Sequence, residues 1–296
     1  MKLENGDSVA IISPASQQRG TDIGLVHQAT EQLMDWGLRV RDLTNLSPCF
    51  YLAGADASRA DSLHRALVDP SIKAVFCTRG GYGSPRLMPY IREWTNVSSK
   101  FLVGYSDVSA LHMAAGVLWP QVIRVHGPNV ATTQFLGDGS DAVHNRNSLR
   151  ELLFCGESNL NESVESLSLG RAEGRIEGGC LSLISSSVGT ALLPNMDDAI
   201  VFLEDVGEPP YRIDRMLTQL KNSRLLDRAA GIVFGQMNRC VDPHNDLKDI
   251  LRDLLCDFRG PVAFGLKSGH GSTNISVMLG QRVCLDTLAG TITSAA

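Results

Sequence analysis

The sequence predicts an α/β protein in two parts, with a parallel sheet in the first and a mixed sheet in the second. Over residues 1–150, short apolar runs alternate with segments of helical period. A polar stretch rich in Ser, Asn and Glu interrupts this pattern at 151–171, and short strands with glycine-rich turns follow it. We therefore expect a domain at 1–150, a linker at 151–171 and a second domain at 172–296.

In the first half, strands and helices are expected in alternation. Ser58–Asp61 resembles a capping box that opens a helix with Leu63 and Leu67 turned inward. Such alternation implies βαβ units, and so a parallel sheet covered on both faces. The expected strands are 8–13, 39–43, 72–78, 101–104 and 122–125, and the expected helices are 21–36, one opening at 58, and 107–118.

In the second half, the pattern changes to an α/β unit with an antiparallel tail. The helix expected at 211–221 carries Ile213, Met216, Leu217 and Leu220 on one face. Short strands joined by tight turns close the chain, which favours antiparallel pairing there. The expected strands are 199–203, 231–234, 274–279, 281–286 and 291–294, and a second helix is expected at 246–258.

Composition excludes several classes of protein. The 27 Lys and Arg against 32 Asp and Glu give a net charge of −5, so no nucleic-acid partner is expected. No apolar run approaches the roughly 18–20 residues of a membrane span, and the N-terminal apolar run at 9–12 is shorter than the roughly 7–15 residues of a secretory signal. The seven cysteines are scattered and lack a C-x-x-C pair, which argues against a disulfide framework and a structural zinc site. We expect a soluble cytoplasmic protein with no membrane contact, metal or cofactor.

A serine stands where a predicted strand turns into a helix. The strand ends at Gly104, and Ser106 precedes a helix that begins near Asp107. Ligands bind at this edge of an open α/β sheet, and a serine on so sharp a turn is exposed as a nucleophile. The esterase pattern G-x-S-x-G would have glycine in place of Val108, so a simple helix cap remains an alternative role for Ser106.

A glycine-rich loop follows the strand expected at 72–78. Gly80, Gly81 and Gly83 let the backbone approach an anion closely. The loop fits neither the Walker pattern nor the dinucleotide pattern, and by itself it is most simply a flexible connector. Beside an elbow serine, it would supply the second donor of an oxyanion hole.

The second half offers a base and its partner. Glu204 and Asp205 directly follow the strand expected at 199–203, and His270 lies between two glycines. A serine needs a base within hydrogen-bond reach, histidine suits this role near neutral pH, and a carboxylate behind the imidazole fixes its tautomer. Taken singly, Glu204 is an ordinary strand-end residue and His270 an ordinary loop residue.

Together these features resemble one family. The order Ser106, Glu204, His270 and the blocks around it resemble the LD-carboxypeptidase family of serine peptidases over nearly the whole chain. The blocks are RGGYGSPRL from residue 79, GYSD from 104, HGP from 126, GG from 178, FLEDVGEPPYRIDRML from 202, and GHG from 269 with Asn274.

The resemblance implies a flavodoxin-like N-terminal domain and a C-terminal swivelling β/β/α domain, with a triad of Ser106, His270 and Glu204 assembled across their interface. Family members remove the terminal D-alanine of murein tetrapeptides by cutting between an L-configured centre and D-Ala. A sister branch resembles the microcin C self-immunity peptidase, which cleaves an aminoacyl-nucleotide amide. The resemblance also favours a homodimer. Asn129 replaces the family's usual apolar residue and Met278 its common proline, which leaves substrate preference open.

On this interpretation, the oxyanion would lie between the backbone N–H of Asp107 and that of Gly80 or Gly81. A carboxypeptidase must also bind a terminal carboxylate, for which cations are suited. Arg79, Arg86 and Arg212 are the candidates, although solvated or ion-paired arginines explain them equally well. Tyr82 is a further candidate for substrate binding, and Glu208 for contact with a substrate ammonium.

Two other classes of function remain open from the sequence. The glycine-rich loop and the helix after Gly104 could hold an anionic ligand in a protein without catalytic activity. Glu204, Asp205 and His270 could instead bind a metal ion for hydrolysis, although no H-E-x-x-H or comparable spacing is present.

Overall fold

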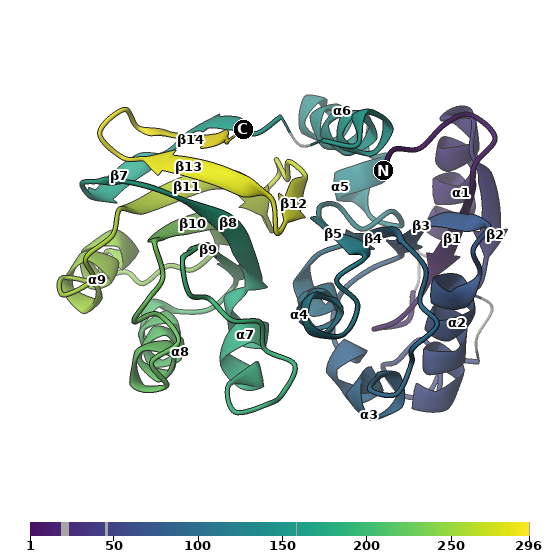
Figure 1. The fold of residues 1–296 in the computed structure, drawn as a ribbon, viewed down its shortest axis with the longest axis horizontal. Coiled ribbons are helices and arrows are strands. Elements are labelled where there is room, and N and C mark those ends of the chain that lie inside the picture. The colour runs from purple at the N-terminus through teal and green to yellow at the C-terminus, as the bar shows by residue number, and fades with distance from the viewer. Residues whose placement is uncertain (19–23, 45–46, 158, 296) are drawn as a thin grey trace. The chain divides into compact units, whose positions relative to one another are not determined.

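The structure is a computed structural model that describes residues 1–18, 24–44, 47–157 and 159–295. It divides into two compact units, each built around its own sheet (Figure 1). The first unit comprises Met1–Glu157 with Ser272–Ser276, and the second comprises Ser158–Gly271 with Val277–Ala296. The predicted α/β class, with a parallel sheet followed by a second sheet, is confirmed.

In the first unit, parallel strands lie in the order β2-β1-β3-β4-β5. This is the strand order of flavodoxin-like sheets, whose ligands bind beyond the carboxyl ends of the strands, where the order reverses. That point is between β1 and β3. The strands are β1 (Ser8–Ile12), β2 (Arg39–Asp42), β3 (Ile72–Cys77), β4 (Lys100–Gly104) and β5 (Val122–His126).

The central strands of this sheet are apolar and buried, as a sheet covered on both faces requires. All of β4 is buried, and so are the last four residues of β1 and of β3. Helix α2 packs against β1 and β3, and α4 packs against β5. The helices are α1 (Leu25–Asp35), α2 (Asp56–Val68), α3 (Met88–Ile91), α4 (Ser109–Leu118), α5 (Thr133–Leu136) and α6 (Ser140–Cys155), with 3₁₀ turns at Ser84–Leu87 and Ser106–Val108.

Two helix predictions differ from the structure, and the helices α3, α5 and α6 of this unit were not predicted. The predicted capping box is wrong, because α2 begins at Asp56, which leaves Ser58 inside its first turn. The Asp56 carboxylate binds Arg59 and Arg86, so a salt-bridged acid opens this helix in place of a capping serine. Helix α1 begins at Leu25, and residues 21–23 of the predicted helix lie outside the described residues. Helix α6 has few apolar positions and gave no clear helical period.

The second unit holds an eight-stranded mixed sheet in the order β6-β14-β13-β8-β9-β10-β11-β7. Strands β8 to β11 are parallel, and β13 and β7 pair antiparallel to β8 and β11. The strands are β6 (Asn161–Ser163), β7 (Glu165–Ser168), β8 (Arg171–Cys180), β9 (Ala199–Val206), β10 (Gly231–Asn238), β11 (Val262–Gly269), β13 (Arg282–Asp286) and β14 (Thr291–Ser294). The short β12 (Val277–Leu279) precedes β13.

Helices α7 (Leu181–Ser187), α8 (Pro210–Asn222) and α9 (Leu247–Leu254) lie on one side of this second sheet (Figure 1). As predicted, α8 buries Ile213, Leu217 and Leu220, whereas Met216 is only half-buried. The stretch 151–171 holds the end of α6 and the strands β6 and β7. Among the described residues, no helix is both long and apolar enough to cross a membrane.

Candidate active site

Ser106 lies on a strained turn directly beyond β4. Its φ of +65° places a non-glycine residue in the left-handed region, which L-residues adopt rarely and at a cost of roughly 1–3 kcal/mol. The 3₁₀ turn Ser106–Val108 leads straight into α4. The predicted strand-to-helix elbow is therefore present, and its strain exceeds what helix capping requires.

Gly80 lies against this serine. A Cβ built on Gly80 would stand 2.8 Å from Cβ and 2.9 Å from Oγ of Ser106, and 3.4 Å from the backbone nitrogen of Asp107. Any side chain at position 80 would therefore collide with the hydroxyl. The glycine brings the loop backbone next to both Ser106 and the Asp107 N–H, which is the arrangement that an oxyanion hole needs.

The glycine-rich loop is held in place by groups on three sides. The Tyr82 N–H donates to Ser16 Oγ at 3.1 Å, and the Ser84 N–H donates to the buried Asp107 carboxylate at 2.7 Å. The guanidinium of Arg59, fully buried, donates to the Gly83 carbonyl at 2.9 Å and also to the carbonyls of Pro14 and Gly54. These contacts favour an ordered loop over a flexible connector.

Asn129 holds the residue before the serine. Its Oδ1 accepts from the Tyr105 N–H at 3.3 Å and its Nδ2 donates to the Tyr105 carbonyl at 3.4 Å. The side chain is buried beside Gly104, where an added Cβ would stand 2.8 Å from Oδ1. The sequence marked Asn129 only as a departure from the family pattern, and its contact with the elbow was missed.

In the second unit, Glu204 and His270 form a buried pair. Glu204 lies on β9 with no exposed side-chain surface, and His270 follows β11. His270 Nδ1 and Glu204 Oε2 are 2.6 Å apart, a short distance typical of a charge-assisted bond. A Cβ on Gly269 would stand 2.6 Å from the same oxygen, so the glycine before His270 leaves the carboxylate its space.

Three charged groups act on His270. Burial by itself lowers the pKa of His270, but the Glu204 carboxylate raises it, with a smaller contribution from Asp205, while Arg239 lowers it. The net effect is a raised pKa, so the imidazolium is stabilised relative to an isolated histidine. This is the state that a base reaches after it has taken a proton.

Asp205 is engaged with the backbone rather than with the imidazole. Its carboxylate accepts from the N–H groups of Ser182 and Val206, both at 2.8 Å. Within the ranges that the structure describes, no group of three or more His, Cys, Asp or Glu side chains could hold a metal ion.

The candidate substrate-binding residues have different surroundings. Arg86 is paired with Asp56 at 2.7 Å, and Arg212 with Glu208 at 3.3 Å, as the alternative interpretation of these arginines expected. Arg79 donates to the Gln17 carbonyl at 3.2 Å. Tyr82 is exposed, and its ring centroid lies 6.0 Å from that of Tyr51.

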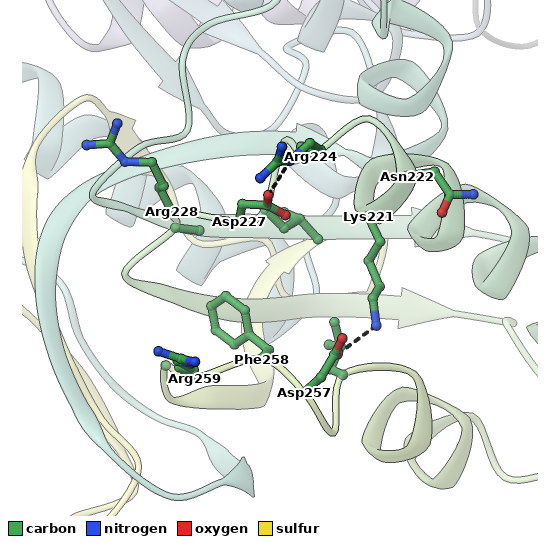
Figure 2. Close-up of a pocket in the computed structure, with 12 residues that line it drawn as sticks. Lys221, Asn222, Arg224, Asp227, Arg228, Asp257, Phe258 and Arg259 are labelled. Carbon is green, nitrogen blue, oxygen red and sulfur yellow. Dashed lines mark hydrogen bonds and ion pairs between the residues drawn. The ribbon is translucent and has the colours of Figure 1, made fainter.

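A cavity of about 550 Å³ lies elsewhere on the second unit, and none of the predicted site residues lines it. Figure 2 shows two ion pairs among its side chains, Arg224 with Asp227 and Lys221 with Asp257, each at 2.7 Å. Lys221 also donates to the carbonyl of Leu254, the last residue of α9. Arg224 and Lys221 are thus bound to neighbouring carboxylates, and Lys221 also to the end of α9.

The predicted residues therefore form two clusters. Ser106, Asp107 and Gly80 come together in the first unit, and Glu204 and His270 come together in the second. The buried Arg59 was missed because its sequence context indicated only a helix start. Its partners lie up to 45 positions away, so no local pattern could reveal them.

Two family models match the chain. The LD-carboxypeptidase N-terminal domain model matches residues 9–127, and the C-terminal domain model matches residues 173–285. A Bacillus subtilis (strain 168) protein named "Probable murein peptide carboxypeptidase" is 34% identical over 96% of this chain and 90% of its own.

Two solved structures share the fold. The muramoyltetrapeptide carboxypeptidase from Oxalobacter formigenes superposes with a TM-score of 0.80 at 27% identity, covering 96% of this chain and 97% of its own. The microcin C7 self immunity protein MccF, in complex with aspartyl sulfamoyl adenosine, superposes with a TM-score of 0.88 at 21% identity, covering 100% and 97% of the two chains.

Proposed function

Because this chain belongs to the LD-carboxypeptidase family and is a serine carboxypeptidase, we propose that it releases terminal D-alanine from murein tetrapeptides with Ser106, His270 and Glu204 as its triad. The observation that carries the proposal is the left-handed backbone of Ser106 with Gly80 against its hydroxyl. Strain of this kind persists only where the surrounding structure enforces it, and it is common at nucleophiles.

In the proposed reaction, Ser106 Oγ attacks the carbonyl carbon of the scissile amide while Nε2 of His270 accepts the hydroxyl proton. The short bond from Nδ1 to Glu204 supports this tautomer and stabilises the imidazolium that forms. His270 then gives the proton to the leaving nitrogen of D-alanine, and water hydrolyses the acyl-enzyme by the same route. The working enzyme must bring Nε2 within hydrogen-bond reach of Oγ.

The oxyanion is proposed to bind the backbone N–H of Asp107 together with that of Gly80 or Gly81. A Cβ built on Gly80 would stand 3.4 Å from the backbone nitrogen of Asp107, and this closeness of the two backbones supports the assignment. Removal of one such donor costs about 3–4 kcal/mol of transition-state stabilisation in other hydrolases.

The substrate class is proposed from the relatives that act on murein peptides. The likeness to the microcin immunity protein shows the fold alone, so an aminoacyl-nucleotide amide serves as the alternative in the assay.

A cytoplasmic setting is proposed because the chain carries seven scattered cysteines. A homodimer is proposed from the family resemblance, and sedimentation velocity tests it.

The test is release of D-alanine from an L,D-linked tetrapeptide by the wild type and by Ser106→Ala. We expect the variant to lose about 10³-fold or more in kcat, because no other group in the proposed site can replace the hydroxyl. Ser99→Ala, an exposed serine of the same unit, is the matched control and should retain full activity.

An aminoacyl sulfamoyl adenylate is assayed in parallel. Hydrolysis of that compound without release of D-alanine would replace the proposed substrate and keep the triad. Wild-type turnover by Ser106→Ala would refute the triad.

A further inference from the structure

The turn after β10 contains a strained arginine. The Cys240 N–H donates to the Met237 carbonyl, which closes a turn around Asn238 and Arg239. Arg239 is the third residue of this turn and has a φ of +56°. Glycine and asparagine are the residues that normally occupy such a position, because an L-residue with a long side chain is strained there. An arginine is uncommon at this position.

This turn runs beside His270. Asn238 Nδ2 donates to the His270 carbonyl at 2.8 Å, and Gln236 pairs in register with Gly269. A Cβ on Gly271 would overlap the Gln236 side-chain amide, so the two segments are in close contact on both sides of the histidine. The Arg239 charge is near enough to lower the pKa of His270.

Arg239 is exposed and has no carboxylate partner among the residues that the structure describes. Arg86 and Arg212, by contrast, are held by Asp56 and Glu208. The positive charge of Arg239 opposes formation of the imidazolium to a small extent, and an anion bound to Arg239 would remove this opposition.

The chemistry of a carboxypeptidase supplies such an anion at this position. The leaving nitrogen receives its proton from the imidazole, and a single carbon atom separates that nitrogen from the terminal carboxylate of the substrate. A group that binds this carboxylate must therefore lie close to the base. A guanidinium suits the role because it binds carboxylates through two parallel hydrogen bonds.

We propose that Arg239 binds the terminal carboxylate of the substrate and so restricts the enzyme to cleavage at a free carboxyl end. This assignment rests on the proposed function and gives the carboxylate a partner that the sequence did not suggest. A carboxylate bound there would also cancel the opposition of Arg239 to the charged imidazole.

The experiment compares Arg239→Gly with the wild type on two tetrapeptides, one ending in D-alanine and one in D-alaninamide. Glycine tolerates the left-handed backbone, so the variant should fold with an unchanged or higher Tm. We expect kcat/KM for the free acid to fall on the order of 10²-fold while that for the amide changes little. Arg239→Lys should recover part of the loss by keeping the charge.

Arg224→Gly is the matched control, because Arg224 is also exposed, has a φ of +63° and lies in the same unit. It is paired with Asp227, so its removal should leave both kcat/KM values unchanged. Wild-type preference for the free acid in Arg239→Gly, or an equal loss on both peptides, would overturn the role of Arg239. Failure of the wild type to release D-alanine would overturn the proposed function as well.

Discussion

The residues on both sides of Ser106 are held by contacts that support its left-handed backbone. Gly104 ends β4, and Asn129 binds both the N–H and the carbonyl of Tyr105. The chain then enters the turn that opens α4, with the Asp107 carboxylate held by the Ser84 N–H. Contacts before and after the serine thus stabilise its strained conformation and hold its hydroxyl beside Gly80.

The charge of Glu204 sets the pH range in which His270 can act as a base. The pKa of His270 is raised, so the imidazole stays protonated to a higher pH and activity falls as pH decreases through that value. Glu204→Gln keeps a hydrogen-bond acceptor for Nδ1 but removes the charge. We expect the acidic limb of the kcat/KM profile to move to lower pH, with kcat reduced by about 10²-fold or more.

A pH–rate profile from pH 4 to 9 measures this shift. Besides Glu204, the charged groups that act on His270 are Asp205 and Arg239, and both remain in the variant. Glu173→Gln removes a surface carboxylate on β8 and should leave the profile unchanged. An acidic limb at the same pH in Glu204→Gln and the wild type would show that Glu204 does not act on the base.

At the scale of elements, strand order explains why distant residues meet. β3 and β4 are neighbours in the first sheet, so the loop after β3 and the elbow after β4 emerge side by side. This places Gly80 against Ser106 although 26 positions separate them in the chain. The apolar runs of β1, β3 and β4 made these strands predictable.

Other elements could not be predicted, for physical reasons. β8 carries three glycines and several charged residues, which reads as a loop. In the sheet, Gly178 is required because a Cβ there would stand 1.9 Å from the Phe202 carbonyl oxygen of β9. Side-chain roles that depend on such neighbours, including those of Asn129 and Arg59, follow from the fold and not from local sequence.

A buried asparagine of helix α6, Asn145, binds the backbone of the segment Ser272–Ser276 at two points. Asn145 Nδ2 donates to the Ser272 carbonyl at 2.9 Å, and Oδ1 accepts from the Asn274 N–H at 2.6 Å. Asn145→Leu would leave both backbone groups without these partners. We expect the free energy of unfolding to fall by roughly 2–4 kcal/mol.

Urea denaturation measures this loss. Asn147→Leu, an exposed position on the same helix, should change the free energy of unfolding by less than about 0.5 kcal/mol. Equal stability of the two variants would show that Asn145 does not anchor the segment.

At the scale of the whole molecule, the proposed machinery is divided between the two units. Ser106 and its oxyanion donors belong to the first, and His270 and Glu204 to the second. Each cluster is ordered by contacts within its own unit, yet neither is a catalyst alone, because a serine hydroxyl without a base is a poor nucleophile. Activity should therefore depend on the two units acting together.

Labelling with a serine-directed fluorophosphonate, read by mass spectrometry of the modified peptide, tests this dependence most directly. We expect rapid modification of Ser106 in the wild type and in His244→Gln, which changes an exposed histidine of the second unit, and almost none in His270→Gln. Equal labelling of Ser106 with and without the imidazole of residue 270, or no labelling of Ser106 in the wild type, would contradict the triad.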